Sequence, residues 1–252
     1  MGVKYNTDHF LQSVESYFNF ALSVDCVVFG FDNKSLKVLL IKSKMEPYIG
    51  QWSLIGDMLQ TDEELDAAAN RILEYRTGLK NVFLKQAKTF GRVDRHPLGR
   101  VVTIAYVALV RIKDYEISTE NMQNEAHWHH INQIPELAFD HNNILDYCLE
   151  TLRKKVREEP VGFALLPDKF TIFELQSLYE SILNEKIDKR NFRKKILSMQ
   201  ILEPCNETQK GVPHRPAKLY HFNRDKYKKL KQNGWVFTLK FPSGSKPSEN
   251  GV

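Results

Sequence analysis

Cysteine is scarce in this chain of 252 residues, and the three that occur, Cys26, Cys148 and Cys205, are odd in number and far apart. Their spacing argues against a disulfide framework and against a zinc cluster, and it favours free thiols in a reducing compartment. No stretch reaches the roughly 18 uninterrupted apolar residues of a membrane span. The charged residues scattered through positions 1–20 are not typical of a signal peptide. We therefore expect a cytoplasmic protein without a membrane segment.

The two parts of the chain carry opposite net charge. Residues 1–150 hold 15 Lys and Arg against 20 Asp and Glu, whereas residues 151–252 hold 21 against 11. The balance is −5 in the first part and +10 in the second, which together make the formal net charge of +5. A basic second part suits a polyanionic partner such as nucleic acid.

Strand-like runs dominate the first 150 residues. Residues 24–32 and 36–42 flank a turn signal and predict a hairpin. Thr61 and Glu64 have the spacing of a capping box, and Gly78 suits the C-cap of the helix that would follow. Further extended runs are expected near 52–59, 82–92, 100–112 and 126–131, with a helix from about 142 to 157. This order predicts a layered domain of the α+β or α/β class, and the α+β class is our choice.

The pattern changes after Pro160, where a helix cannot comfortably continue. Thr171 and Glu174 form a second capping box, and Asp188 can cap another helix that runs to about residue 198. Two short helices followed by extended runs near 201–205 and 217–222 are typical of a winged helix-turn-helix. The predicted division is a first domain over 1–159, a second over 160–241, and a disordered Ser/Gly/Pro-rich tail over 242–252.

The second of these helices is strongly basic. No acidic residue lies between Lys189 and Lys195, and Phe192 and Ile196 supply a buried stripe. Cations bind phosphates, and Arg or Asn pairs with base edges, which are the needs of a recognition helix. A merely solvated basic face is the plainer alternative. The predicted DNA-binding residues are Lys189, Arg190, Asn191, Arg193 and Lys194, with Arg215 at the tip of the wing.

A stretch of the first domain resembles the Nudix box, GX5EX7REUXEEXGU, in which U is a bulky apolar residue. The match is anchored on Gly78 and Leu79, and it keeps Glu63, Arg71 and Leu73. The three glutamates of the catalytic helix fall instead on Ile72, Tyr75 and Arg76. Positions i, i+3 and i+4 share one helix face, and hydrolysis of a diphosphate there needs clustered carboxylates that hold magnesium. We therefore expect neither a metal site nor an enzyme, although an unrelated amphipathic helix would show the same stripe.

Two further segments resemble the Nudix-related transcriptional regulators. One runs from Thr89 to Val102, and the other, the more specific, runs from Phe163 to Ala217. With residues 135–141, the resemblance covers nearly all of 20–222. It implies a Nudix-type α/β/α sandwich followed by a winged helix-turn-helix. It also implies a regulator that binds operator DNA and responds to a sugar or an ADP-ribose-type effector.

The sequence looks closest to the arabinose-responsive branch of that family. Val93, His96 and Leu98 stand where nucleotide-responsive relatives favour Pro, Asp and Arg. We therefore predict a homodimeric repressor of L-arabinose utilisation genes, released from operator DNA by a pentose and needing no cofactor. The alternatives are a regulator of NAD metabolism that responds to ADP-ribose, and an active Nudix pyrophosphohydrolase with an accessory basic domain.

Aromatic and paired polar side chains suit a sugar site. The predicted effector-binding residues are Lys42, Trp52, Glu63, Arg92, Asp94 and Arg95. Each of them, taken singly, is equally typical of a surface ion pair or of core packing. His127 and His129 share a strand face, but no third ligand has useful spacing, so we expect no metal there.

Overall fold

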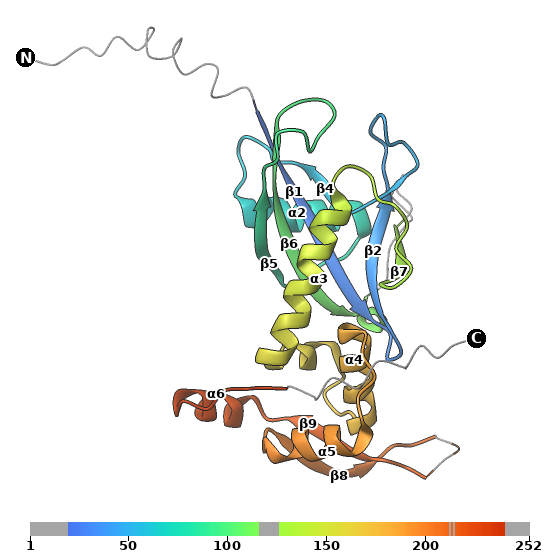
Figure 1. Ribbon diagram of the computed structural model, residues 1–252, viewed down its shortest axis with the longest axis vertical. Coiled ribbons are helices and arrows are strands. Elements are labelled where there is room, and N and C mark those ends of the chain that lie inside the picture. Colours follow the sequence, from blue (N-terminus) through green and yellow to red (C-terminus); the bar gives the residue numbers. More distant parts are fainter. Residues whose placement is uncertain (1–19, 116–125, 212, 214, 240–252) are drawn as a thin grey trace, which may run out of the picture.

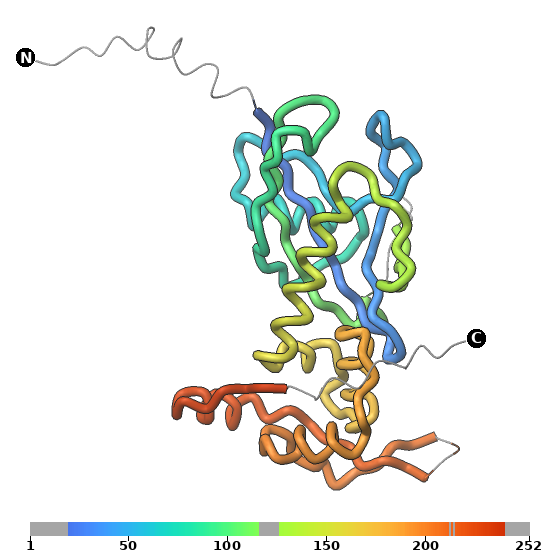
Figure 2. Tube along the Cα trace, in the orientation of Figure 1, coloured from blue at the N-terminus to red at the C-terminus, as the bar shows by residue number. Residues whose placement is uncertain are grey.

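The computed structural model describes residues 20–115, 126–211, 213 and 215–239, so the predicted tail over 242–252 lies outside the described residues. Two parts follow one another along the chain (Figure 1), and in Figure 2 the blue-to-green segments make up one end of the molecule and the orange-to-red segments the other. The first part contains β1 (Ala21–Phe31), β2 (Leu36–Lys42), β3 (Trp52–Ser53), β4 (Ile55–Met58), α2 (Leu65–Thr77), β5 (Leu84–Phe90), β6 (Val101–Arg111), a short 3-10 helix η2 (Ile112–Asp114), β7 (Ala126–His130) and α3 (His141–Glu158). The second contains a 3-10 helix η3 (Pro160–Leu165), α4 (Ile172–Leu183), α5 (Lys189–Ser198), β8 (Leu202–Thr208), β9 (Lys218–Phe222) and α6 (Arg224–Gln232).

The strands of the first part form one mixed sheet in the order β3-β2-β1-β6-β5, with β4 also paired to β1 and β7 to β2. The parallel pair of β1 and β6 runs along all of both strands. Side chains alternate across β1: Val24, Cys26 and Val28 pack with α2, whereas Val27 and Phe29 pack with α3. A strand covered on both faces is expected to be mostly apolar, which fits the continuous buried run of β1, where Asp25 is the one charged residue. The predicted α/β/α sandwich is confirmed.

Local signals placed most helix ends correctly. Gly78 adopts a left-handed φ of 75° and its N–H bonds Glu74 O, so the predicted C-cap is confirmed. The capping box at Thr61 is wrong, because α2 begins at Leu65 and its N-cap is Glu64, which makes no side-chain cap bond.

The second part is a winged helix, as predicted. Glu174 N donates to Thr171 Oγ1 at 3.1 Å and Thr171 N donates to Glu174 Oε2 at 2.7 Å, which completes the capping box of α4. Asp188 caps α5 through Asn191 N at 2.8 Å. β8 and β9 pair antiparallel as the wing. Helix α6 was not expected, because four of its nine residues are lysines and only two of its side chains, Tyr227 and Leu230, pack inward.

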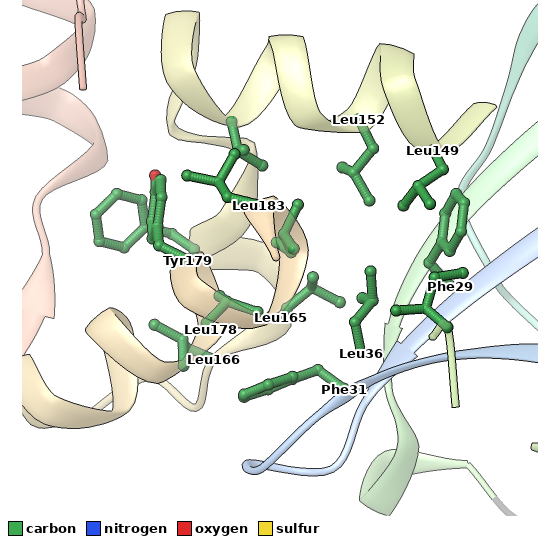
Figure 3. Packing of buried hydrophobic residues seen from close by; sticks show 14 of the residues in the cluster. Phe29, Phe31, Leu36, Leu149, Leu152, Leu165, Leu166, Leu178, Tyr179 and Leu183 are labelled. Atoms are coloured by element: carbon green, nitrogen blue, oxygen red, sulfur yellow. The ribbon is translucent and has the colours of Figure 1, made fainter. Parts of the chain in front are cut away.

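One continuous apolar core joins the two parts (Figure 3). Leu36 of β2, Leu152 of α3 and Leu178 of α4 are all buried within it. Polar contacts reinforce the junction: Leu36 N donates to Ser181 Oγ at 2.6 Å, and Arg153 Nε donates to Ile182 O at 3.1 Å. The winged helix is therefore packed against the end of the sheet rather than tethered to it. In the part of the chain that the structure describes, no helix is long and apolar enough to cross a membrane.

Candidate functional site

A cavity of about 280 Å³ opens between β1, β4, the last turn of α2 and the start of α3. The segments that line it, the first half of β1, β4 and the start of α3, lie toward the end of the sheet that points away from the winged helix (Figure 1). Charged and titratable groups gather in it. Its lining includes the cations Lys42, Lys44, Arg76 and Arg95, the carboxylates Asp25 and Asp57, and the imidazoles His96 and His141.

The floor of the cavity is a buried ion-pair cluster. Arg95 donates to both carboxylate oxygens of Asp140, at 3.1 and 2.7 Å, and its Nη2 lies 3.7 Å from Asp25 Oδ2. Thr103 Oγ1 donates to the same Asp25 oxygen at 2.7 Å. A buried charge is costly unless it is paired, so these contacts make Arg95 mainly an anchor that ties the loop 91–100 to the start of α3.

His141 is the uncharged member of this cluster. Its Nδ1 accepts a hydrogen bond from Leu54 N at 3.0 Å, so the ring proton is on Nε2, which lies 3.6 Å from Asp25 Oδ1. Burial lowers the pKa of His141 below its usual 6.5, more strongly than Asp25 and Asp140 raise it.

Gly56 is required for this packing. A Cβ built on Gly56 would lie 2.0 Å from Asp25 Oδ1, so any side chain at this position would force the buried carboxylate to shift. The glycine just before the box position Asp57 therefore lets β4 approach the carboxylate on β1.

Aromatic rings form one side of the cavity. His96 stacks on Phe139 with centroids 5.1 Å apart and planes at 11°, and Tyr48 lies 4.6 Å from Phe139 on a tilted ring. Phe139 has a φ of 58°, a left-handed conformation that is rare for a bulky residue and is held only where the surroundings require it. Burial lowers the pKa of His96, so this ring is also mainly uncharged near neutral pH.

The helix of the degenerate box does not present its three substituted positions on one open face. Ile72 is fully buried in the core, Tyr75 is 66% exposed, and Arg76 reaches the cavity and pairs with Asp57. The three positions share one side of α2 by their spacing, but the sheet covers the part of that side that carries Ile72, so the side is not open as a whole. Within the ranges described, no group of three or more His, Cys, Asp or Glu side chains is placed to hold a metal ion.

The structure brings together only some of the predicted effector-binding residues. Lys42 and Arg95 line the cavity, and Lys42 Nζ lies 3.9 Å from the ring centroid of Trp52. Glu63 is instead bound to Arg71 at 2.8 and 2.5 Å, which lowers its pKa.

Arg92 and Asp94 pair with each other at 2.8 Å on the exposed loop and do not line the cavity. His127 and His129 pack their edges against Trp52. Sequence reasoning missed Asp25, Arg76, Phe139 and His141. A signal existed for Asp25, because it is a lone charge inside a buried apolar strand.

The basic surface lies on the winged helix. On α5, Phe192 and Ile196 are buried against α4, whereas Lys189, Arg190, Asn191, Arg193 and Lys194 are all exposed. Arg215 is exposed beside the wing. The predicted DNA-binding side chains are therefore free to reach a ligand from a capped, anchored helix.

Known proteins share both parts of this chain. Residues 19–152 match the NUDIX domain and residues 162–222 match the NrtR DNA-binding winged helix domain. The ADPR responsive transcriptional repressor NtrR of Acinetobacter baylyi is 32% identical over 210 residues, which cover 82% of this chain and 83% of that protein.

The crystal structure of Shewanella oneidensis NrtR is 30% identical with a TM-score of 0.67, covering 80% of this chain and 93% of that one. The same protein complexed with a 27mer DNA is 28% identical with a TM-score of 0.65, covering 87% and 99%. Its NUDIX domain complexed with ADP ribose is 28% identical with a TM-score of 0.50, covering 59% and 99%. With both domains matched in order, this chain belongs to the Nudix-related transcriptional regulators, as a Nudix domain followed by an NrtR-type winged helix domain.

Proposed function

We propose that this protein is a transcriptional repressor that holds operator DNA with α5 and the wing, and that ADP-ribose bound in the Nudix cavity releases it. The observation that carries the proposal is the continuous core between the two sites, since a ligand at one end of the packed body can influence the other. The relatives named above are described as ADPR responsive or are solved with DNA or ADP ribose, which supports both partners.

The chemistry of the cavity favours a nucleotide over the pentose that we predicted. L-Arabinose carries no charge, whereas the lining offers four cationic side chains against two carboxylates. The His96–Phe139 stack offers a flat face on which an adenine ring can stack. The relatives give L-arabinose no support, so ADP-ribose, our alternative, replaces it as the proposed effector.

Helix α3 is the connection between the two sites. It has 18 residues and is therefore about 27 Å long. Its first residue, His141, lies in the cavity floor, and Leu149, Leu152 and Val156 lie in the core that the winged helix shares. A small displacement of the start of α3 by the ligand would therefore move the packed junction.

The test uses the duplex that the full chain selects from a random DNA pool. Fluorescence anisotropy of that duplex is followed while ADP-ribose is added, with L-arabinose in a parallel titration. We expect ADP-ribose to weaken DNA binding by roughly 5- to 150-fold, the usual range of allosteric coupling. By reciprocity, the duplex should weaken ADP-ribose binding by the same factor. An identical ADP-ribose affinity with and without the duplex would contradict the proposal.

We also propose that the Nudix domain is not catalytic, because α2 carries no carboxylate cluster. Incubation with ADP-ribose and Mg²⁺ tests this. Metal-dependent turnover on the order of 1 per second or faster would instead support the pyrophosphohydrolase alternative.

Finally, we propose that the protein works in the cytoplasm as a homodimer, since one winged helix reads few base pairs and regulators of this kind gain affinity by two-fold pairing. Light scattering of the free and DNA-bound protein tests it, and a monomer in both states would contradict it.

A further inference from the structure

We propose that Arg76 binds the diphosphate of the effector and supplies there the positive charge that magnesium supplies in a Nudix hydrolase. The inference rests on the proposed function, because it concerns the same cavity. It assigns a role to a residue that the box pattern classes only as a lost glutamate.

Arg76 is placed to contact a ligand in the cavity. It occupies the last turn of α2, lines the cavity, and pairs with Asp57 on the neighbouring strand β4. Its Nε is buried and has no hydrogen-bond partner among the residues that the structure describes. A buried donor without an acceptor is unfavourable. The Arg76 side chain is 22% exposed, so a guanidinium that turned toward a phosphate in the cavity would gain the acceptor that Nε lacks.

The other charges of the cavity act in the same direction as Arg76. Arg95 belongs to the buried cluster with Asp25 and Asp140. Apart from that cluster, the lining has the cations Lys42, Lys44 and Arg76 and the carboxylate Asp57. That excess matches a diphosphate, which is anionic, and it opposes the entry of a divalent cation.

A guanidinium also suits this ligand by its shape. Its planar donors pair with two phosphate oxygens at once, which a lysine cannot do. The neighbouring positions add no carboxylate, since Ile72 is buried in the core and Tyr75 points to solvent. The cavity would therefore bind ADP-ribose without metal.

Substitutions of the two members of the Arg76–Asp57 pair should change the affinity for ADP-ribose in opposite directions. Asp57 competes with phosphate for the guanidinium, so Asp57→Asn should strengthen ADP-ribose binding while Arg76→Gln weakens it. If the pair had only a structural role, both substitutions would weaken binding.

The experiment is calorimetric titration of the full chain with ADP-ribose, once in EDTA and once with Mg²⁺. We expect the wild-type affinity to be the same in both buffers. Arg76→Gln should lose affinity by on the order of 10- to 100-fold, because a charge-assisted hydrogen bond is lost. The affinity of Arg76→Lys should lie between those of the wild type and Arg76→Gln, since lysine keeps the charge without the bidentate geometry. The matched control is Lys80→Gln, because Lys80 is exposed just beyond α2 and pairs with Glu74 outside the cavity.

Three results would overturn the inference and leave the proposed function standing. They are wild-type affinity in Arg76→Gln, wild-type binding that needs Mg²⁺, and weaker binding in Asp57→Asn, which would show a structural pair. If the wild type binds no ADP-ribose in either buffer, the proposed function fails and this inference fails with it. A melting curve for each variant separates lost binding from lost folding.

Discussion

Replacing Leu36 by alanine should loosen both parts of the molecule together. Leu36 begins β2, is fully buried, and packs in the core that joins the sheet to α4 (Figure 3). Its backbone N–H also bonds Ser181 of α4, and that bond survives the substitution. The change removes buried apolar volume at the junction and little else.

The expected cost follows from burial. A fully buried leucine replaced by alanine loses its transfer free energy and leaves a cavity, which together amount to about 3 kcal/mol. For a chain of this size that corresponds to a fall in Tm of roughly 6–12 °C. Where exchange occurs through global unfolding, the same cost raises amide exchange roughly 100-fold, since about 1.4 kcal/mol is a factor of ten.

Native-state hydrogen exchange, read by mass spectrometry, measures both parts in one sample. We expect protection of peptides from β1 and from α4 to fall by the same factor in Leu36→Ala. The matched control is Leu98→Ala, which removes the same atoms from a side chain that is 71% exposed. Its effect should stay within about 0.5 kcal/mol. Faster exchange in β1 with unchanged protection in α4 would refute the idea that one core holds the two parts.

Three other outcomes can be measured. Arg190→Ala or Arg193→Ala should lose roughly 1–3 kcal/mol of DNA-binding free energy if the side chain reads a base, whereas Lys80→Ala should bind as the wild type does. An equal loss on every duplex would show a phosphate contact, and unchanged binding in both arginine variants would refute the recognition helix. Tyr179→Phe should raise the free energy of unfolding by about 1 kcal/mol in denaturant titrations, because the buried Tyr179 hydroxyl has no partner among the described residues. A clearly lower free energy of unfolding would contradict this. Burial lowers the pKa of His141, so the unfolded chain binds a proton there first, and stability should fall as the pH drops below about 6.5. The Tm of His141→Gln should therefore depend less on pH between 7 and 5 than the Tm of the wild type, and an equal dependence would contradict this.

Local sequence signals were most reliable where chemistry acts over a few residues. The capping box at Thr171 and Glu174, the Asp188 cap and the Gly78 C-cap all lie where they were expected. Such signals depend only on hydrogen bonds within one helical turn, so no distant segment can overrule them easily. The predicted box at Thr61 is absent, because α2 begins only at Leu65 and Glu64 is its N-cap without a side-chain cap bond.

The outward basic face of α5 could also be read from the sequence. Phe192 and Ile196 fix which side of the helix is buried, and the cations occupy the rest. The cavity was harder to predict, because its floor joins Asp25 to residues about 70 and 115 positions further along the chain. Only the parallel pairing of β1 with β6, and the packing of α3 across them, makes those residues neighbours.

Sequence by itself therefore determined most of the order of elements, though not α6, together with the two domain types and the loss of the box glutamates, since each of these is recorded in short-range spacing. Tertiary structure alone decided which substituted position reaches the cavity. The sequence shows that residue 76 is an arginine and not a glutamate. That the Arg76 side chain lies in the cavity beside Asp57 depends on how α2 packs on the sheet. The junction has the same origin: leucines of β2, α3 and α4 are ordinary core residues in their own segments, and the long-range packing of those segments makes them one core.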